Sequence, residues 1–227
     1  RPMNAILDPI PPLPKIFGEA RQVAYIVDNL DEAINRWHSE HGVGPFLVAR
    51  KARPLNNAFY RGRKARDTRV NIAFAYIGDM QLELIELIGD TPSLYKEALD
   101  REDYGVNHYA VCVEDFPAAY HWGLDNGFTS VVDAGVDGLA RMSYIEKIDN
   151  NERLILEVIE WNPLTRPYFD ELARMTAQAD PEQLVHEFSL ADLTPKGAVL
   201  LQLLKFVFNK ALGRIPRTLP TDPAGTS

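Results

Sequence analysis

The sequence contains an internal repeat, and a repeated unit constrains the fold of a chain more than any single motif does. Residues 22–33, QVAYIVDNLDEA, align without gaps on residues 108–119, HYAVCVEDFPAA. Residues 82–86, LELIE, match residues 156–160, LEVIE, at four of five positions. Both pairs of segments occur in the same order, so the chain is predicted to contain two copies of one supersecondary unit.

Each copy is predicted to fold as a βαβββ module, because apolar alternation marks four strands and one helical pattern follows the first strand. The modules span residues 20–88 and 106–161, and a helix near residues 91–102 is expected to join them. The first pair of repeats is offset by 86 residues and the second pair by 74, so the first module carries about 12 extra residues before its last strand. An α+β fold follows from this pattern.

The regions on either side of the modules have different patterns. Residues 1–19 hold four prolines between residues 9 and 14 and are expected to form an extended arm. Residues 162–227 are expected to form a helical extension, with helices near residues 166–178, 181–188 and 194–212. The last of these helices has one polar stripe on an apolar cylinder, so we expect it to be mostly buried, against its own domain, over the mouth of the sheet or at a subunit contact. A membrane-surface role for it is less favoured.

Composition and charge exclude several classes of protein. The balance of 24 Lys and Arg against 32 Asp and Glu gives a net charge of −8, which argues against a nucleic-acid-binding protein. The single cysteine, Cys112, cannot form an internal disulfide, and a cytoplasmic location is expected. The most apolar stretch, residues 198–208, is too short and too polar for a transmembrane segment.

Polar side chains occupy matched positions on the predicted strands of both modules. Gln22 lies on the first strand of the first module, and His108 lies at the equivalent position of the second. Glu83 and Glu157 lie at equivalent positions on the closing strands. Burying a carboxylate in an apolar strand costs free energy unless it has a partner or a metal. One such glutamate is more often on the solvent face, but its recurrence in both modules favours a shared site.

These residues and modules resemble the vicinal oxygen chelate superfamily, which includes glyoxalase I, methylmalonyl-CoA epimerase, extradiol dioxygenases and bleomycin-resistance proteins. The resemblance covers roughly residues 20–161 and implies that the two modules form a U-shaped mixed sheet. It also implies a divalent metal ion (Zn, Co, Mn, Fe or Ni) held by Gln22, Glu83, His108 and Glu157. This ligand set is most similar to that of glyoxalase I and the epimerases, since Gln22 stands where extradiol dioxygenases need a histidine.

The resemblance implies a lyase, isomerase or epimerase reaction on a small carbonyl compound or thioester through a metal-stabilised enolate. Glu157 is our first choice for the proton shuttle, and Glu83 is the second. Two alternatives stay open: a metal-free small-molecule binding protein of the bleomycin-resistance type, and a ring-cleaving dioxygenase. A small-molecule substrate and a homodimer are expected.

Residues 50–69 hold eight basic residues and one acid, in the region of the extra residues of the first module. Arg61, Arg63 and Lys64 are the candidates for a clamp on the carboxylate, phosphate or coenzyme A tail of an anionic substrate. The alternative is a solvated hairpin whose charges prevent the sheet edge from pairing with another chain.

Overall fold

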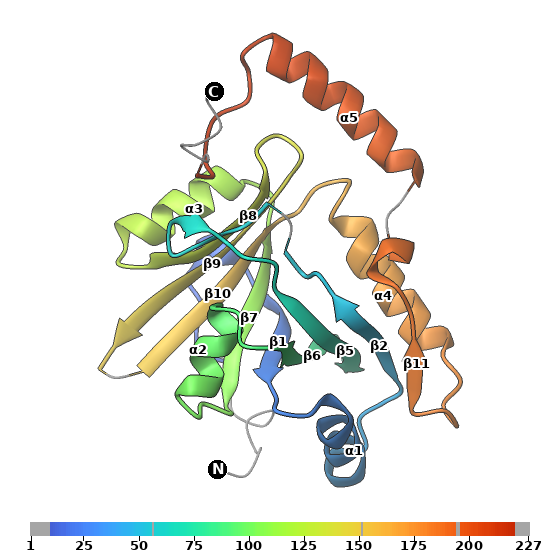
Figure 1. Cartoon of the computed structure of the whole chain (residues 1–227). Coiled ribbons are helices and arrows are strands. Elements are labelled where there is room, and N and C mark those ends of the chain that lie inside the picture. The colour runs from blue at the N-terminus through green and yellow to red at the C-terminus, as the bar shows by residue number, and fades with distance from the viewer. Residues whose placement is uncertain (1–9, 56, 151, 194–195, 221–227) are drawn as a thin grey trace.

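The computed structural model describes residues 10–55, 57–150, 152–193 and 196–220 of the 227-residue chain (Figure 1). The first module contains β1 (Ala20–Ile26), α1 (Leu30–His41), β2 (Phe46–Ala52), β5 (Arg69–Ile77) and β6 (Met80–Ile88), with β3 (Phe59–Tyr60) and β4 (Arg63–Lys64) between β2 and β5. The helix α2 (Leu94–Asp100) leads to the second module, which contains β7 (Val106–Val113), α3 (Phe116–Asp125), β8 (Thr129–Val136), β9 (Ala140–Asp149) and β10 (Glu152–Glu160). The predicted α+β fold with two βαβββ modules is confirmed.

Short elements lie on either side of the modules. The 3-10 helix η2 (Lys15–Phe17) precedes β1. After β10 come α4 (Arg166–Gln178), β11 (Val185–Glu187), the 3-10 helix η3 (Leu190–Leu193) and α5 (Lys196–Ala211). Within the described residues, none of the helices has the length and apolar character needed to span a bilayer.

The strands form one mixed sheet in the order β11-β2-β5-β6-β1-β7-β10-β9-β8-β3-β4. The modules meet where β1 pairs antiparallel with β7, and each of these strands pairs in parallel with the closing strand of its own module. In this register Ala24 lies opposite His108 on one side and Glu83 on the other. The centre of the sheet therefore carries the polar residues of both modules.

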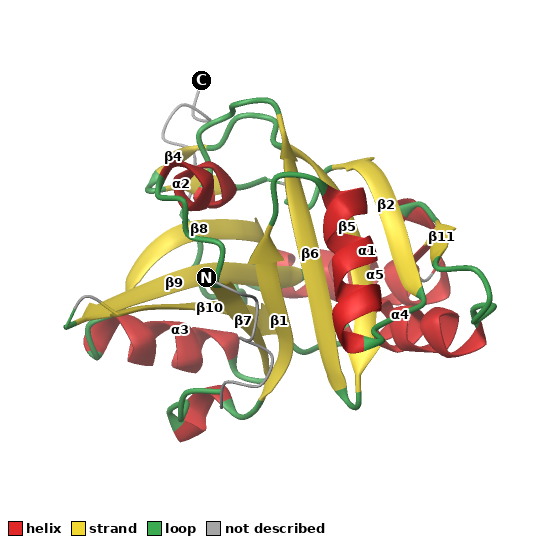
Figure 2. Ribbon diagram, turned by 90° about the horizontal axis from the view of Figure 1, so that it is seen from below, coloured by secondary structure: helices red, strands yellow, loops and turns green. Residues whose placement is uncertain are grey.

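The two faces of the sheet bury different hydrophobic clusters. On the outer face α1 and α3 pack through Trp37 and Phe116, both fully buried, and Figure 2 shows each helix beside the strands of its own module. On the inner face, which carries Ala24 and Ile26, residues of both modules pack with α2 and α4. Because α4 and α2 cover only part of this inner face, space for a site is left on it.

The repeat also sets where the two outer helices begin. Asn29 and Asp115 lie at equivalent positions, and the side chain of each accepts a hydrogen bond from the backbone N–H three residues on. These bonds satisfy amide groups that lack a partner in the first helical turn. The two helices thus begin at the same distance after their strands because a capping side chain stands at the same position in both modules.

The extra residues of the first module form a hairpin that pairs with the second module. In it Phe59 lies opposite Asp133, and Tyr60 lies opposite Val132 of β8. The hairpin turns at Arg61 and Gly62, whose φ angles of 45° and 74° are both positive, as a tight two-residue turn requires. The hairpin therefore extends the sheet of the second module rather than that of its own.

Two predictions for the C-terminal extension are wrong. Residues 181–188 do not form a helix, because Val185–Glu187 pair in parallel with β2 and satisfy the backbone groups at that edge of the sheet. Over the side chains that the structure describes, residues 203–211, helix α5 is not mostly buried against its own domain, since Leu204 and Phe208 are 60% and 61% exposed. Helix α4 lies where it is predicted.

Candidate functional site

The four candidate ligand residues come together on the inner face of the sheet. Gln22, Glu83 and Glu157 are nearly buried, and His108 is completely buried. The Nε2 atom of His108 lies 3.4 Å from Oε2 of Glu83 and 3.6 Å from Oε2 of Glu157. One imidazole edge therefore faces a carboxylate from each module.

Hydrogen bonds from outside the site orient two of these side chains. The Nδ1 atom of His108 lies 3.0 Å from Oδ1 of Asn107. An amide oxygen only accepts, so Nδ1 carries a hydrogen, and the Nε2 edge of the ring points at the carboxylates. The amide nitrogen of Gln22 donates to Oε1 of Gln81 at 2.7 Å, and Gln81 donates in turn to the hydroxyl of Tyr76. The carbonyl oxygen of Gln22 is thereby left for the site.

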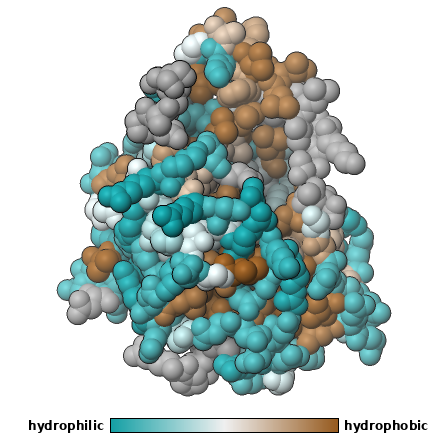
Figure 3. Space-filling view, viewed as in Figure 1, coloured by the Kyte–Doolittle hydropathy of each residue, from teal (hydrophilic) through white to brown (hydrophobic). Residues whose placement is uncertain are grey.

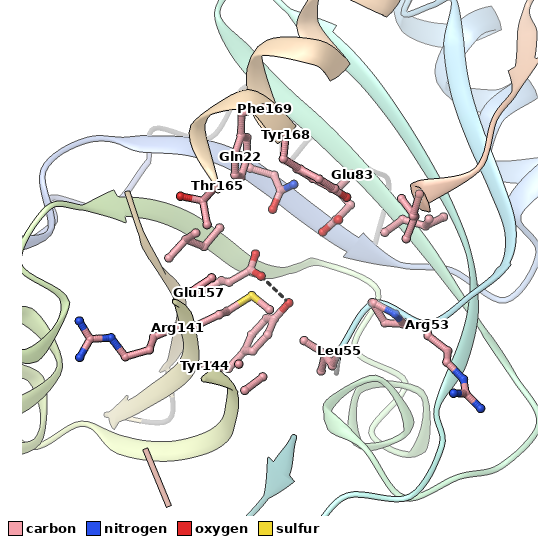
Figure 4. A pocket seen from close by; sticks show the side chains of 18 of the residues that line it. Gln22, Arg53, Leu55, Glu83, Arg141, Tyr144, Glu157, Thr165, Tyr168 and Phe169 are labelled. Carbon is pink, nitrogen blue, oxygen red and sulfur yellow. Dashed lines mark hydrogen bonds between the residues drawn. The ribbon is translucent and has the colours of Figure 1, made fainter. Parts of the chain in front are cut away.

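The hydroxyl of Tyr144 holds the carboxylate of the second module. It donates to Oε1 of Glu157 at 2.9 Å, the dashed line in Figure 4. Burial, followed by the charge of Glu157, raises the pKa of Tyr144 well above its ordinary value. Tyr144 therefore keeps its proton and acts as a permanent donor to Glu157.

Three buried polar atoms of the site have no hydrogen-bond partner among the described residues: Oε1 of Gln22, Oε2 of Glu83 and Nε2 of His108. Buried polar atoms are rarely left unpaired, because each lost bond to water costs free energy. Amide, carboxylate and deprotonated imidazole atoms of these kinds bind metal ions, and Nε2 of His108 would first release the proton that its raised pKa favours. No group of three or more His, Cys, Asp and Glu side chains in the described part of the chain is arranged to hold a metal ion as it stands, so a metal would require small shifts of these side chains.

The electrostatics of the site also favour an added positive charge. Burial alone lowers the pKa of His108, but the hydrogen bonds and charges of Glu157 and Glu83 outweigh it and raise the pKa to about 9. Burial raises the pKa of Glu83, and the charge of Glu157 adds to the effect while His108 opposes it. Two carboxylates thus compete for one buried cation.

A cavity of about 400 Å³ lies against Gln22, Glu83 and Glu157 (Figure 4). Its volume is in the range of small-molecule sites. The rest of its wall is mostly apolar and aromatic, and its larger apolar and aromatic members are Leu55, Ile72, Phe74, Tyr95, Met142, Tyr144, Ile159, Leu164, Tyr168, Phe169 and Leu190.

The sequence did not predict part of this wall. Tyr168 and Phe169 belong to α4, so the C-terminal extension helps to build the cavity. Tyr144 could have been found, because it lies directly opposite Glu157 in the β9–β10 pair and shares its face. No local sequence signal placed α4 on the inner face.

Two arginines border the cavity, and both are paired with acids. Arg141 is buried and makes two parallel hydrogen bonds to the carboxylate of Glu160, at 2.9 and 2.8 Å. Arg53 donates to Asp67 at 2.7 Å. Figure 4 shows both guanidinium groups directed away from Glu83 and Glu157. The centre of the cavity is therefore acidic and apolar.

The predicted clamp residues do not line this cavity. Arg61 donates two hydrogen bonds to Glu97 of α2 and one to Glu146 of β9, and Arg153 bonds to the same two acids. Burial alone would raise the pKa of Glu97, but its hydrogen bonds from Arg61 and Tyr60 lower it to about 2. Arg61 thus tethers the hairpin to α2 and β9.

The other two candidates lie on β4, where Arg63 and Lys64 are exposed. The ammonium group of Lys64 donates to Oδ1 of Asn57 at 2.8 Å. The acids that bind Arg61 are distant in sequence. For this reason the charges of residues 50–69 did not indicate its partners.

The Arg61→Ser substitution is expected to lower the free energy of unfolding by about 1–2 kcal/mol, because Glu146 is buried and loses a charged partner. The double substitution Arg63→Ser and Lys64→Ser is the control and should change it by less than about 0.5 kcal/mol, as exposed charges do. Urea denaturation of both variants measures the difference. Equal stability of the two variants would contradict the tethering role of Arg61.

Comparison with known proteins identifies the family of this chain. Residues 21–145, more than half of the chain, match the family model of the Glyoxalase/Bleomycin resistance protein/Dioxygenase superfamily. The chain therefore belongs to this superfamily. No curated protein matches the sequence.

Several solved structures are similar to parts of this chain. A hypothetical protein from Bacillus halodurans has 14% identity and a TM-score of 0.42, with 63% of this chain and 96% of that one covered. Methylmalonyl-CoA epimerase from Mycobacterium tuberculosis has 17% identity and a TM-score of 0.42, with 65% and 93% covered. A variant of 4-hydroxymandelate synthase from Streptomyces coelicolor has 15% identity and a TM-score of 0.39, with 63% and 48% covered.

Proposed function

We propose that this protein is a metal-dependent enzyme of the glyoxalase type, a lyase, isomerase or epimerase that moves a proton next to a carbonyl group. The observation that carries the proposal is the set of three buried polar atoms on Gln22, Glu83 and His108 that make no hydrogen bond to the described residues. Gln22 and Glu83 line the cavity, His108 lies beside Glu83, and the three residues come from both modules.

The residues fit a divalent transition metal. Two carboxylates, one imidazole and one amide oxygen suit Zn, Co, Mn, Fe or Ni. Gln22, Glu83, His108 and Glu157 would hold the ion, with Asn107 and Gln81 orienting two of them. When bound, the ion would polarise the substrate carbonyl and stabilise the charge of an enolate.

The protein's own groups can handle the proton. Glu157 lines the cavity, and its Oε1 atom accepts a hydrogen bond from the hydroxyl of Tyr144. Its Oε2 atom accepts no hydrogen bond from Tyr144. A carboxylate fixed in this way can take a proton from a substrate carbon and return it. Glu83, across His108 from Glu157, is the second candidate for this role.

The cavity favours a neutral, largely apolar carbonyl compound over a substrate with a charged tail. Its wall is aromatic and aliphatic around two carboxylates, and neither arginine among the described lining residues is unpaired. An anionic tail in this cavity would therefore find no unpaired arginine among the described lining residues to bind it. This replaces the expectation of a clamp at Arg61, Arg63 and Lys64.

The proposal is tested by metal analysis and thermal denaturation of protein purified without chelator. We expect one transition-metal ion per chain, and a rise in Tm of about 5–10 °C when the metal is added to the chelator-treated protein at about 100 times its Kd. Absence of bound metal after reconstitution, together with an unchanged Tm, would overturn the proposal.

The same preparation separates the two alternatives. A metal-free binding protein would keep its affinity for apolar ligands after chelator treatment, without turnover. A ring-cleaving dioxygenase would consume oxygen with catechols after anaerobic loading with iron. The proposed enzyme should instead exchange substrate α-protons with solvent deuterium only when metal is present.

A further inference from the structure

We propose that α5 docks on an anionic lipid surface. Five large apolar side chains at and just beyond this helix are exposed: Leu203, Leu204, Val207, Phe208 and Leu212. Figure 3 shows hydrophobic residues gathered at the end of the molecule where α5 lies. A contiguous exposed apolar patch on a folded domain marks an interaction site.

The apolar side of α5 faces away from the protein. Phe206 and Asn209, three residues apart on one side of the helix, are half-buried, whereas Leu203, Leu204, Val207 and Phe208 are exposed on the other side. A helix that packs on its own domain turns its apolar side inward. Because the apolar side of α5 points outward, we infer that it contacts an apolar environment outside the chain.

The charges beside this apolar side define the partner. In a helix that turns by about 100° per residue, Lys205 and Lys210 fall at the two edges of the apolar arc. Arg214 and Arg217 follow, and residues 203–219 contain no acid, although the whole chain carries −8. Flanking cations with apolar stems are the arrangement by which an interfacial helix holds anionic headgroups while its apolar side enters the acyl boundary.

The same charges argue against a second copy of this chain as the occupant. In a symmetric dimer a surface patch meets itself, so the four cations of one α5 region would face the same four cations of the other. Like charges brought together in this way oppose association. An anionic lipid surface satisfies both the apolar side and the cations.

The helix is attached firmly enough to position the enzyme on such a surface. The backbone N–H groups of Thr218 and Leu219 donate to the carboxylate of Asp137 in the β8–β9 loop, at 3.0 and 3.2 Å. Arg141 also donates to the hydroxyl of Thr218 at 3.1 Å. Gly135 lines both the site cavity and the hollow beneath α5, so α5 lies close to the wall of the cavity.

Vesicle co-sedimentation of the full chain at low salt tests the proposal. We expect binding to phosphatidylcholine vesicles that contain phosphatidylglycerol, and much weaker binding to phosphatidylcholine alone. Each of the substitutions Lys205→Gln, Lys210→Gln and Arg214→Gln should weaken binding about fivefold. The triple substitution Leu204→Ser, Val207→Ser and Phe208→Ser should abolish it.

Ile148→Ser is the matched control, since Ile148 is 62% exposed, like Val207, and lies at the far end of β9. It should leave vesicle binding unchanged. The proposal is overturned if wild-type protein stays in the supernatant with anionic vesicles, or if the triple serine variant still sediments with them. It is equally overturned if light scattering shows that the triple variant converts a dimer to a monomer without lipid, because the apolar side would then belong to a second copy. Metal content is independent of all these outcomes.

Discussion

Replacing His108 with Ala is expected to lower the affinity for a divalent transition metal by more than about 100-fold. Loss of a residue that only orients a metal ligand lowers the affinity by up to about 100-fold, and loss of a ligand should lower it further. In the proposed metal site His108 would supply the single nitrogen ligand, and its imidazole faces the carboxylates of both modules. Without the imidazole of His108, the carboxylates of Glu83 and Glu157 have no positive charge between them. The site also loses the side chain that contacts a carboxylate of each module. Competition with a chromophoric chelator measures the affinity.

Cys112→Ala is the control for this experiment. Cys112 lies on the same strand and the same face as His108, and burial raises the pKa of its thiol to about 12, so it is a poor metal ligand. Its substitution should leave metal affinity within a factor of about two. If both variants bind metal like the wild type, the four residues do not form a metal site.

Leu172→Ala is expected to lower the free energy of unfolding by about 2–4 kcal/mol, because Leu172 is completely buried and is the one described residue of α4 that is. It belongs to the inner-face cluster together with residues of both modules. Since α4 also carries Tyr168 and Phe169 into the cavity wall, the variant should bind apolar ligands more weakly as well. Denaturation and hydrogen exchange of α4 measure the two effects.

The exposed Arg174 of the same helix provides the comparison. Arg174→Ala removes a surface ion pair with Glu171 and should leave stability close to that of the wild type, with ligand affinity unchanged. A Leu172 variant that matches it in stability and affinity would show that α4 does not support the cavity.

The sequence predicts the fold and the polar centre of the site because both depend on repeated local patterns. Gln22 and His108 could be matched through the strands around them, and side-chain alternation then placed each residue on a face. The matching sequences of the closing strands likewise placed Glu83 and Glu157 at equivalent positions on one face of the sheet. Where a feature recurs in two modules, chance is a poor explanation for it.

Contacts between distant segments could not be predicted in this way. The partners of Arg61 come from α2 and β9, and nothing near Arg61 in sequence indicates them. Residues 185–187 form a strand only because the edge of β2 offers backbone partners. The apolar pattern of α5 predicted that the helix packs on its own domain, but its described apolar side chains from Leu203 to Phe208 are mostly exposed.

The pairing of β3 with β8 has a consequence for how the protein is made. Phe59 finds its strand partner at Asp133, so the first module cannot complete its structure while the second is still being synthesised. Contacts that close such long loops form late and slow the folding of a chain. The two repeats can begin to fold independently, but they must finish as one unit, and a fragment that ends after β6 would leave its hairpin without a strand to join.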